Sequence, residues 1–291
     1  MNIYASYQCN LCCSFCSLWN NNSQRIDLNW VKEELKQHPD LAHDLTILGG
    51  EPSVLPVDYQ QELIAICAHA EGKKPYYITN LLSPSPVISQ TNLIVSYDFD
   101  LRKQHKKVLY NIINLNQEFA ISTILTDHLI NHIGAIKYLK FIDSIKNCKR
   151  ADLVIYYKSK KDKLDYTPQK DSLLEFVSTV MSHSKVCMAP LSQMKNEIPC
   201  SFDDMSDFFA FLPDNNYGVR LDYDNGPYKK FNTYKDAKLY YDESIKNSLC
   251  SKCKYINYCW YPCSSNTCHG EKEMMEIFYN YAKQQKIRKT S

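Results

Sequence analysis

Glycine is scarce in this chain, with 7 residues among 291. Collagen-like repeats, glycine-rich linkers and low-complexity segments all need far more glycine, so the composition excludes them. We therefore expect each remaining glycine to stand where the backbone needs its small size or its conformational freedom. Gly49 and Gly50 are adjacent in the sequence, which makes this pair the first candidate for such a position.

The chain also lacks an excess of charge of either sign. Lysine and arginine together number 34, and aspartate and glutamate number 32, so the net charge is +2. This balance gives no electrostatic footprint for nucleic acid or an acidic membrane. The first residues lack the basic and apolar regions of a secretory signal, and prolines interrupt the uncharged stretch 75–97, which argues against a membrane span. We therefore expect a cytoplasmic protein that binds neither nucleic acid nor membrane.

Cysteine, in contrast, is abundant, with 13 residues. In a reducing compartment, cysteines serve as metal ligands or catalytic thiols more often than as disulfides. Four of them lie within residues 9–16 and five within 250–268. This spacing indicates two metal-binding regions. Cys67, on the apolar face of a predicted helix, and Cys148, at a predicted helix end, are interpreted as structural thiols.

The stretch between the two cysteine clusters alternates between strand-like and helix-like patterns. Short runs rich in β-branched and aromatic residues predict strands at 2–7, 45–49, 75–80, 92–97, 118–125 and 152–157. Helical periodicity predicts one helix capped by Asp27 and further helices at 58–70, 100–113, 127–147 and 168–182. Such alternation indicates a parallel sheet, and six units make three quarters of an eight-fold barrel. We predict an α/β fold, a partial (β/α)6 TIM-like barrel, over residues 1–185.

Two of these segments carry apolar residues at helical spacing. Val31 and Leu35 follow the Asp27 cap at helical spacing, and Leu109, Ile112 and Ile113 follow the basic stretch within 100–113. After residue 185 the pattern changes. An apolar run, a turn and a second apolar run predict a hairpin at 208–222, and 271–285 predicts a closing helix. Residues 186–291 are therefore assigned to a small cysteine-rich C-terminal domain.

Cys9, Cys13 and Cys16 follow the first predicted strand with the spacing C-x3-C-x2-C. Three thiolates on one loop can bind three irons of a cubic cluster and leave the fourth iron open. Soft thiolates suit iron–sulfur clusters and zinc, but structural zinc sites prefer four ligands. A zinc loop or plain buried thiols remain the alternatives. Cys12 is not needed as a ligand in this pattern and is interpreted as packing.

The second predicted strand ends in Gly49-Gly50-Glu51-Pro52. Two adjacent glycines let the backbone of a ligand approach closely, and the carboxylate of Glu51 beside them suits an ammonium group. The alternative is an ordinary turn at the end of a strand.

Together these two motifs carry a resemblance. The run C-N-L-C-C-S-F-C followed by G-G-E-P resembles the radical S-adenosylmethionine (SAM) superfamily over roughly residues 2–160. The resemblance implies a partial (β/α)6 barrel and a [4Fe–4S] cluster whose open iron is chelated by the amine and carboxylate of SAM. It assigns the cluster ligands to Cys9, Cys13 and Cys16, the SAM amine to Gly49, Gly50 and Glu51, and the adenine contact to Phe15.

Two weaker matches follow along the chain. Ile78-Thr79-Asn80 resembles the third-strand motif T-N-G, with Leu81 in place of the glycine, and Ser96-Tyr97-Asp98 resembles a fourth-strand S-x-D pattern. These matches add Asn80 and Ser96 to the SAM-binding set, although polar strand ends would look the same. The resemblance also implies an external electron donor such as flavodoxin or ferredoxin, one-electron cleavage of SAM, and a 5′-deoxyadenosyl radical that abstracts hydrogen from substrate.

The second cysteine cluster resembles the SPASM extension of radical SAM enzymes, which binds auxiliary [4Fe–4S] clusters. Carried over, the resemblance gives an outer cluster to Cys250, Cys253, Cys259 and Cys268, and directs Cys263 to an inner cluster. The gap to Cys268 is shorter than usual, and the G-x4-C pattern at the hairpin is missing, since Gly218 leads to Tyr223. Cys187 and Cys200 could supply inner ligands instead, so we expect one or two auxiliary clusters. A zinc ribbon is the alternative.

Three functions remain open on the sequence. Enzymes with this extension mostly oxidise, cross-link or epimerise residues of ribosomally made peptides or of proteins, which favours a peptide-modifying radical SAM oxidoreductase. A radical SAM dehydrogenase or epimerase of a small molecule such as an aminocyclitol is the second, and a non-enzymatic zinc or iron–sulfur protein is the third. Asp222 and Asp224 are candidates for a general base. Because the chain begins at the first strand, we expect the hairpin, the barrel mouth or a separate peptide-binding protein to capture a peptide.

Overall fold

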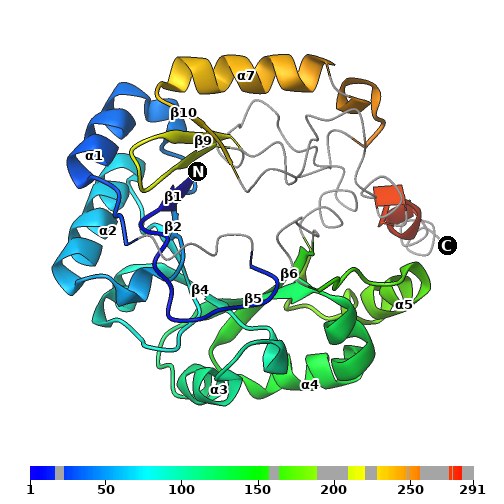
Figure 1. Ribbon diagram of the computed structural model, residues 1–291. Coiled ribbons are helices and arrows are strands. Elements are labelled where there is room, and N and C mark those ends of the chain that lie inside the picture. Colours follow the sequence, from blue (N-terminus) through cyan, green and yellow to red (C-terminus); the bar gives the residue numbers. More distant parts are fainter. Residues whose placement is uncertain are drawn as a thin grey trace.

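The computed structural model describes residues 1–16, 23–156, 164–188, 209–219, 228–247, 249–255, 275–276 and 278–283. These residues form a curved ten-stranded sheet with helices on its outer side (Figure 1). The strand order is β10-β9-β8-β1-β2-β3-β4-β5-β6-β7. Strands β1 to β7 run parallel, which confirms the predicted α/β fold.

All six predicted strands are present. They are β1 (Asn2–Tyr4), β2 (Thr46–Leu48), β3 (Tyr76–Thr79), β4 (Asn92–Ser96), β5 (Phe119–Leu125) and β6 (Cys148–Ile155). Each follows the preceding one in the sheet, so every connection between them crosses over through helical structure, as parallel neighbours require. The long strand β5 buries every second side chain.

Strands from beyond residue 185 extend this sheet at both edges. Strand β7 (Val186–Cys187) pairs in parallel with β6. At the other edge, β8 (Phe209–Phe211) pairs in parallel with β1, and β9 (Tyr217–Val219) and β10 (Lys229–Phe231) follow as antiparallel neighbours. The β8–β9 pair confirms the predicted hairpin.

The helices that cover the sheet begin where local chemistry allows. They are α1 (Leu28–Gln37), α2 (Val57–Glu71), α3 (His105–Ile113), α4 (Ala135–Ser144), α5 (Lys170–Val180) and α7 (Tyr234–Asn247). As expected, the Asp27 carboxylate caps α1 by accepting hydrogen bonds from the backbone of Asn29 and Trp30. Val31 and Leu35 form the buried face of α1. Residues 278–283, within the predicted closing helix, are helical.

Short helical turns occupy the loops between these elements. They are η1 (Pro39–Leu41), η2 (Pro52–Val54), η3 (Pro86–Gln90), η4 (Phe99–Leu101), the π turn η5 (Leu129–Ile133) and η7 (Leu249–Lys252).

Two predicted helices differ from the structure. The segment 100–113 becomes helical only at His105, and its buried face is Val108 and Ile112, whereas Ile113 is 63% exposed. Of the three apolar residues predicted for this segment, Ile112 is buried and Leu109 packs against the core, whereas Ile113 faces solvent and Val108, four residues before Ile112, is buried in its place. The segment 127–147 is divided into η5 and α4 at Gly134, whose φ of 76° interrupts a regular helix.

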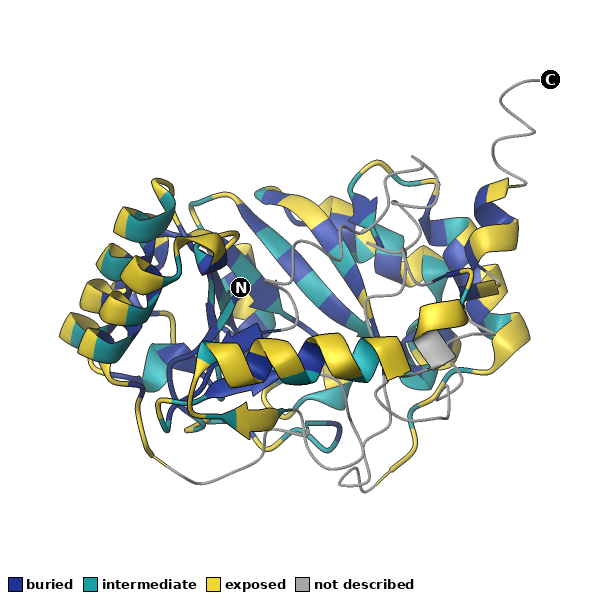
Figure 2. Cartoon of the chain, turned by 90° about the horizontal axis from the view of Figure 1, so that it is seen from above, coloured by how far each residue is buried: buried dark blue, intermediate teal, exposed yellow. Residues whose placement is uncertain are grey.

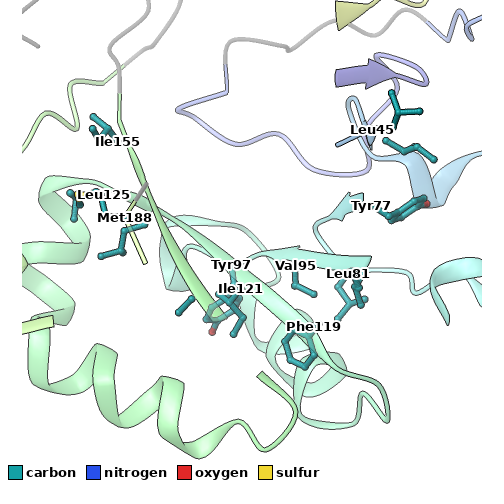
Figure 3. Close-up of a cluster of buried hydrophobic side chains, with 14 of the residues drawn as sticks. Leu45, Tyr77, Leu81, Val95, Tyr97, Phe119, Ile121, Leu125, Ile155 and Met188 are labelled. Carbon is teal, nitrogen blue, oxygen red and sulfur yellow. The ribbon is translucent and has the colours of Figure 1, made fainter. Parts of the chain in front are cut away.

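A continuous hydrophobic core lies between the sheet and its helices. Leu45, Tyr77, Val95, Ile121 and Ile155, from five neighbouring strands or strand ends, belong to it (Figure 3). Seen from above, buried residues gather on the strands and exposed residues on the outer faces of the helices (Figure 2). Among the described residues, no helix is long and apolar enough to cross a membrane.

Candidate active site

One cavity lies beyond the carboxyl ends of strands β1 to β4. The cysteine loop leaves β1, the Gly49-Gly50-Glu51 turn leaves β2, Asn80 follows β3, and Ser96 is the last residue of β4. All nine residues predicted for the SAM cluster and for SAM line this cavity together, namely Cys9, Cys13, Phe15, Cys16, Gly49, Gly50, Glu51, Asn80 and Ser96. The carboxyl ends of parallel strands are where ligands bind in α/β sheets.

The glycine pair is required by the chain itself. The amide of Gly50 donates to the carbonyl of Ser6 at 2.8 Å, and the amide of Glu51 donates to that of Gln8 at 2.8 Å. A Cβ atom on Gly49 would lie 2.3 Å from the Ser6 carbonyl oxygen, and one on Gly50 would lie 2.2 Å from that of Gln8. The two glycines therefore let the backbone that leads into Cys9 lie directly on the end of β2.

Glu51 joins the ends of two strands. Its buried carboxylate accepts hydrogen bonds from the hydroxyl of Thr79 at 2.7 Å, the amide of Asn80 at 2.6 Å and the amide of Ser53 at 3.0 Å. Burial raises the pKa of Glu51 above its usual value, although the hydrogen bonds from Asn80 and Thr79 act in the opposite direction. A positively charged ligand at this wall of the cavity would favour the ionised form.

Asn80 connects the third strand to the cysteine loop. Its amide group donates to the side-chain oxygen of Asn10 at 2.8 Å, and its own side-chain oxygen accepts from the amide of Leu82 at 2.9 Å. Leu81 has a φ of 56°, a left-handed conformation that favours glycine. This is the position at which the T-N-G motif carries glycine, so the chain keeps the backbone turn with a leucine whose side chain is buried.

The cysteine loop holds its thiols in a partly apolar setting. The amide of Leu11 donates to the sulfur of Cys9 at 3.4 Å. Burial raises the pKa of the Cys9 thiol and raises that of Cys13 to about 11, while the charge of Arg102 acts in the opposite direction on both. Within the described ranges, no three His, Cys, Asp or Glu side chains converge closely enough to hold a single metal ion.

Cys12 corrects one expectation. It was interpreted as a packing residue, but the structure exposes its thiol to solvent. The reason is its place in the loop, where the chain turns so that Leu11 is buried instead. Cys67 and Cys148 are fully buried, as expected of structural thiols.

Arg102 lines the same cavity, and the sequence analysis missed it. Its guanidinium forms an ion pair with Asp98 at 2.5 Å and lies 5.4 Å from the ring centre of Phe15. Asp98 also accepts from the amide of Ile124 at 2.7 Å, which fixes the pair to β5. The i,i+4 spacing of an aspartate and an arginine after the fourth strand was the signal that could have found this pair.

Tyr166 also contacts the cysteine loop, and it too was missed. Its hydroxyl lies 2.6 Å from that of Ser14, and its ring meets Phe15 edge-on at 6.3 Å. Phe15 therefore contacts both Arg102 and Tyr166, in addition to lining the cavity. No sequence signal links residue 166 to the loop, because Ser14 and Tyr166 are 152 residues apart in the chain.

Only some of the predicted auxiliary-cluster ligands, and neither of the base candidates, lie within the described residues. Cys187 ends β7 and Cys253 follows η7, and both are partly buried. The backbone of Cys250 belongs to η7. The remaining candidates lie outside the described residues, namely Cys200, Asp222, Asp224, Cys259, Cys263 and Cys268.

Comparison with known proteins identifies the fold. No protein-family model and no curated protein sequence matches the chain. Among solved structures, native anSMEcpe with bound AdoMet shares 16% identity over 99% of this chain and 97% of that chain, with a TM-score of 0.67. Streptococcus suis SuiB bound to its precursor peptide SuiA shares 17% identity over 90% and 71%, with a TM-score of 0.56.

A third solved structure also has a similar fold. The FeFe-hydrogenase maturase HydG from Carboxydothermus hydrogenoformans shares 11% identity over 98% of this chain and 73% of that chain, with a TM-score of 0.52. The chain therefore shares the fold of these proteins, an α/β fold with a mostly parallel sheet, as the sequence predicted.

Proposed function

We propose that this protein is a radical SAM enzyme that oxidatively modifies a peptide or a protein side chain. One observation carries the first part of the proposal. Nine residues chosen from four separate sequence segments line a single cavity at the carboxyl ends of the strands, within the fold of radical SAM enzymes. Fold similarity alone does not define a reaction, so the proposal depends on this convergence.

The cysteine loop fits a [4Fe–4S] cluster. Cys9, Cys13 and Cys16 line the same cavity, and a cubic cluster takes each thiolate at a different iron, whereas structural zinc sites prefer four ligands. When bound, the cluster and SAM together supply one-electron cleavage of the sulfonium and a 5′-deoxyadenosyl radical.

In this proposal the chain's own residues bind and orient SAM and shield it from water. The buried charge of Glu51 favours an ammonium group at the β2 end. Phe15, Leu48 and Ile78 form the apolar part of the lining and exclude water from a reactive intermediate. Asn80 and Ser96 provide polar groups for the rest of the ligand. The Asn80–Asn10 hydrogen bond keeps the cysteine loop in register with these groups.

Support for a peptide substrate comes from the similar structures. One is anSMEcpe with bound AdoMet and the Cp18Cys peptide, and another is SuiB with its precursor peptide. We further propose that Cys250, Cys253, Cys259, Cys263 and Cys268, with Cys187 and Cys200, bind one or two auxiliary clusters, and that Asp222 or Asp224 acts as the base. An auxiliary cluster accepts the second electron of a net oxidation, which favours oxidation over simple return of hydrogen.

The cluster assignment is tested on anaerobically purified protein. We expect iron and sulfide to be present and SAM to be cleaved to 5′-deoxyadenosine under a strong reductant. The triple variant Cys9→Ala, Cys13→Ala, Cys16→Ala should lose cleavage, whereas Cys12→Ala in the same loop should keep it. Zinc in place of iron, or cleavage by the triple variant, would refute the assignment.

The substrate class needs a second assay. Short peptides encoded beside the gene are incubated with the reduced enzyme and SAM, and both 5′-deoxyadenosine and peptide mass are followed. We expect formation of 5′-deoxyadenosine to depend on one such peptide, whose mass falls through loss of hydrogen. Turnover of a small aminocyclitol without any peptide would establish the small-molecule function instead.

A further inference from the structure

Helix α3 presents an unusual outer surface. Lys103, Lys106, Lys107, Tyr110 and Ile113 are all exposed there, the last two by 67% and 63%. We call these five residues the α3 surface. In the part of the chain that the structure describes, none of the three lysines forms an ion pair with a carboxylate within 4.0 Å. The positive charges are therefore available to a partner.

The cations stand at the end of the helix where they are least favourable. Lys106 and Lys107 occupy the first turn of α3, where the positive end of the helix dipole disfavours a cation. The helix has no side-chain cap, and Gln104 before it has a left-handed φ of 60°. These lysines do not serve the stability of the helix. A negatively charged partner would offset the repulsion.

The apolar residues of the α3 surface lie on the same face of the helix as one of its lysines. Lys106, Tyr110 and Ile113 are spaced four and three residues apart, which places them on one face of the helix. The opposite face, Val108 and Ile112, is buried against the sheet. A partner that covers the stripe would meet charge at its N-terminal end and apolar side chains at its C-terminal end, which is the composition of small protein–protein contacts.

The α3 surface begins beside the proposed cluster. Arg102 lines the cavity together with Cys9, Cys13 and Cys16, and Lys103 is the next residue, at most about 3.8 Å further along the backbone. Figure 1 shows α3 and α7 on opposite sides of the ring of helices. A protein bound on the α3 surface would therefore lie near the cavity lined by Cys9, Cys13 and Cys16, whereas α7 lies across the ring from α3.

We propose that the α3 surface docks a small acidic electron-transfer protein that reduces the cluster, an inference that rests on the proposed function. One electron passes from the reduced flavin or iron–sulfur centre of the donor to the cluster, so the donor is oxidised by one electron and no bond or proton is exchanged. Opposite charges raise association rates by factors of about 10 to 1,000 at low ionic strength. Electron-transfer encounters also use small interfaces.

The test compares two triple charge reversals in the holoenzyme. One carries Lys103→Glu, Lys106→Glu and Lys107→Glu on α3. The matched control carries Lys235→Glu, Lys238→Glu and Lys246→Glu on α7, where the three lysines are also exposed and the change in net charge is the same. Cluster reduction is followed by stopped-flow absorbance with two donors, an acidic flavodoxin hydroquinone and the small cation methyl viologen in its reduced form.

We expect the α3 variant to slow reduction by flavodoxin at least about tenfold at low ionic strength. It should also lose the dependence on salt that the wild type shows. The α7 variant should change the rate less than about twofold, and reduced methyl viologen should reduce all three proteins equally. The milder variant Lys103→Gln, Lys106→Gln, Lys107→Gln removes the charges without reversing them and should give a smaller effect of the same sign. It serves as a second test in case the charge-reversed variant does not fold.

Three outcomes would overturn the inference. Equal slowing by the α3 and α7 variants would show an effect of net charge alone. A flavodoxin rate unchanged by the α3 variant would exclude docking there while the cluster still reacts with methyl viologen. A wild-type protein with no cluster that methyl viologen can reduce would overturn the proposed function together with the docking.

Discussion

Gly50 is constrained by space, whereas Gly72 is constrained by backbone angle. A Cβ on Gly50 would lie 2.2 Å from the Gln8 carbonyl oxygen, but one on Gly72 would meet nothing within 4 Å, although φ there is 74°. We predict that Gly50→Ala costs about 1–3 kcal/mol of unfolding free energy through overpacking. Because the strain falls on the backbone that enters the cysteine loop, the iron content should also fall sharply.

Gly72→Ala is the matched control for this prediction. It should cost about 1–2 kcal/mol through its left-handed conformation and leave the iron content unchanged. Urea denaturation and iron analysis measure both effects. An iron content equally unaffected by the two variants would contradict a role of the glycine pair in placing the loop.

The Arg102–Asp98 pair places opposite charges beside the proposed cluster. Replacing Arg102 by glutamine leaves the carboxylate of Asp98, and replacing Asp98 by asparagine leaves the guanidinium. We predict that Arg102→Gln lowers the reduction potential of the cluster and that Asp98→Asn raises it, since negative charge opposes the addition of an electron. A redox titration followed by electron paramagnetic resonance measures both. Shifts of the same sign in the two variants would point to a structural role alone.

Ionisation of Glu51 should make the unfolding free energy depend on pH. Its folded-state pKa is raised by burial, so its protonated form is favoured by folding. The contribution of protonated Glu51 to the unfolding free energy is fully present below the unfolded pKa of about 4.3. This contribution is lost as the pH rises through the folded pKa. We predict that the unfolding free energy of the metal-free protein falls with pH in this window, and that Glu51→Gln flattens the curve.

The exposed Glu118 provides the control for this pH dependence. Glu118→Gln should keep the slope of the wild type in urea denaturation across the same pH window. If Glu51→Gln also kept that slope, ionisation of another group would have to account for the pH dependence.

At the scale of elements, strands were easier to predict than helix faces. Strands β1 to β6 were predicted because short runs rich in β-branched and aromatic residues are typical of strands. The buried residues of α3 were predicted only in part, because two apolar spacings compete within nine residues and the packing decides between them. Likewise, the cysteine and Gly-Gly-Glu segments are local motifs, whereas Arg102 and Tyr166 acquire their roles only when separate loops meet.

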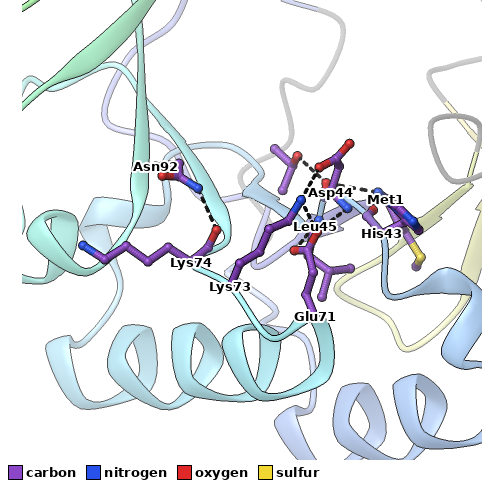
Figure 4. A network of polar contacts seen from close by, with 9 residues as sticks. Met1, His43, Asp44, Leu45, Glu71, Lys73, Lys74 and Asn92 are labelled. Carbon is purple, nitrogen blue, oxygen red and sulfur yellow. Dashed lines mark hydrogen bonds and ion pairs between the residues drawn. The ribbon is translucent and has the colours of Figure 1, made fainter.

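The end of α2 is bound to the start of β2 by a polar network (Figure 4). The Glu71 carboxylate, with only 5% of its side chain exposed, accepts from the amides of Asp44 and Leu45 and pairs with Lys73 at 3.0 Å. The N-terminal ammonium of Met1 donates to the carbonyls of His43 and Asp44. The network satisfies backbone groups at the start of a buried strand, which is where an unpaired group costs most.

Glu71→Ala tests this network. We predict a loss of about 1–3 kcal/mol of unfolding free energy, because two backbone amides lose their acceptor. Lys73→Ala should cost less than about 1 kcal/mol, since the ammonium is half exposed and its ion pairs are screened by water. Urea denaturation of both variants is the measurement, and a larger effect of Lys73→Ala would show that charge, not the backbone bonds, dominates.

At the scale of the whole molecule, the segment after residue 185 completes the sheet. Phe211 of β8 is fully buried, and Trp30 of α1 packs against both Phe211 and Tyr217 at 4.8 and 5.6 Å between ring centres. The hydroxyl of Tyr217 donates to the carboxylate of Glu34. The sequence placed a domain boundary at 185 because the pattern of alternating strands and helices changes there, but it carried no sign that β8 would pair with β1.

These contacts predict that hairpin and barrel unfold as one cooperative unit. Phe211→Ala should cost about 3–5 kcal/mol, the usual range for a buried phenylalanine. If unfolding is shared, the buried thiols of Cys67 in α2 and Cys148 in β6, both fully inaccessible, should become reactive together and by the same factor. Site-resolved mass spectrometry of thiol labelling measures this, with the half-exposed Leu239→Ala as the control that changes neither rate. If neither cysteine were labelled faster in Phe211→Ala, the hairpin would open independently of the barrel, since local opening at one edge of the sheet leaves the core of the barrel closed. Residue 185 would then separate two folding units.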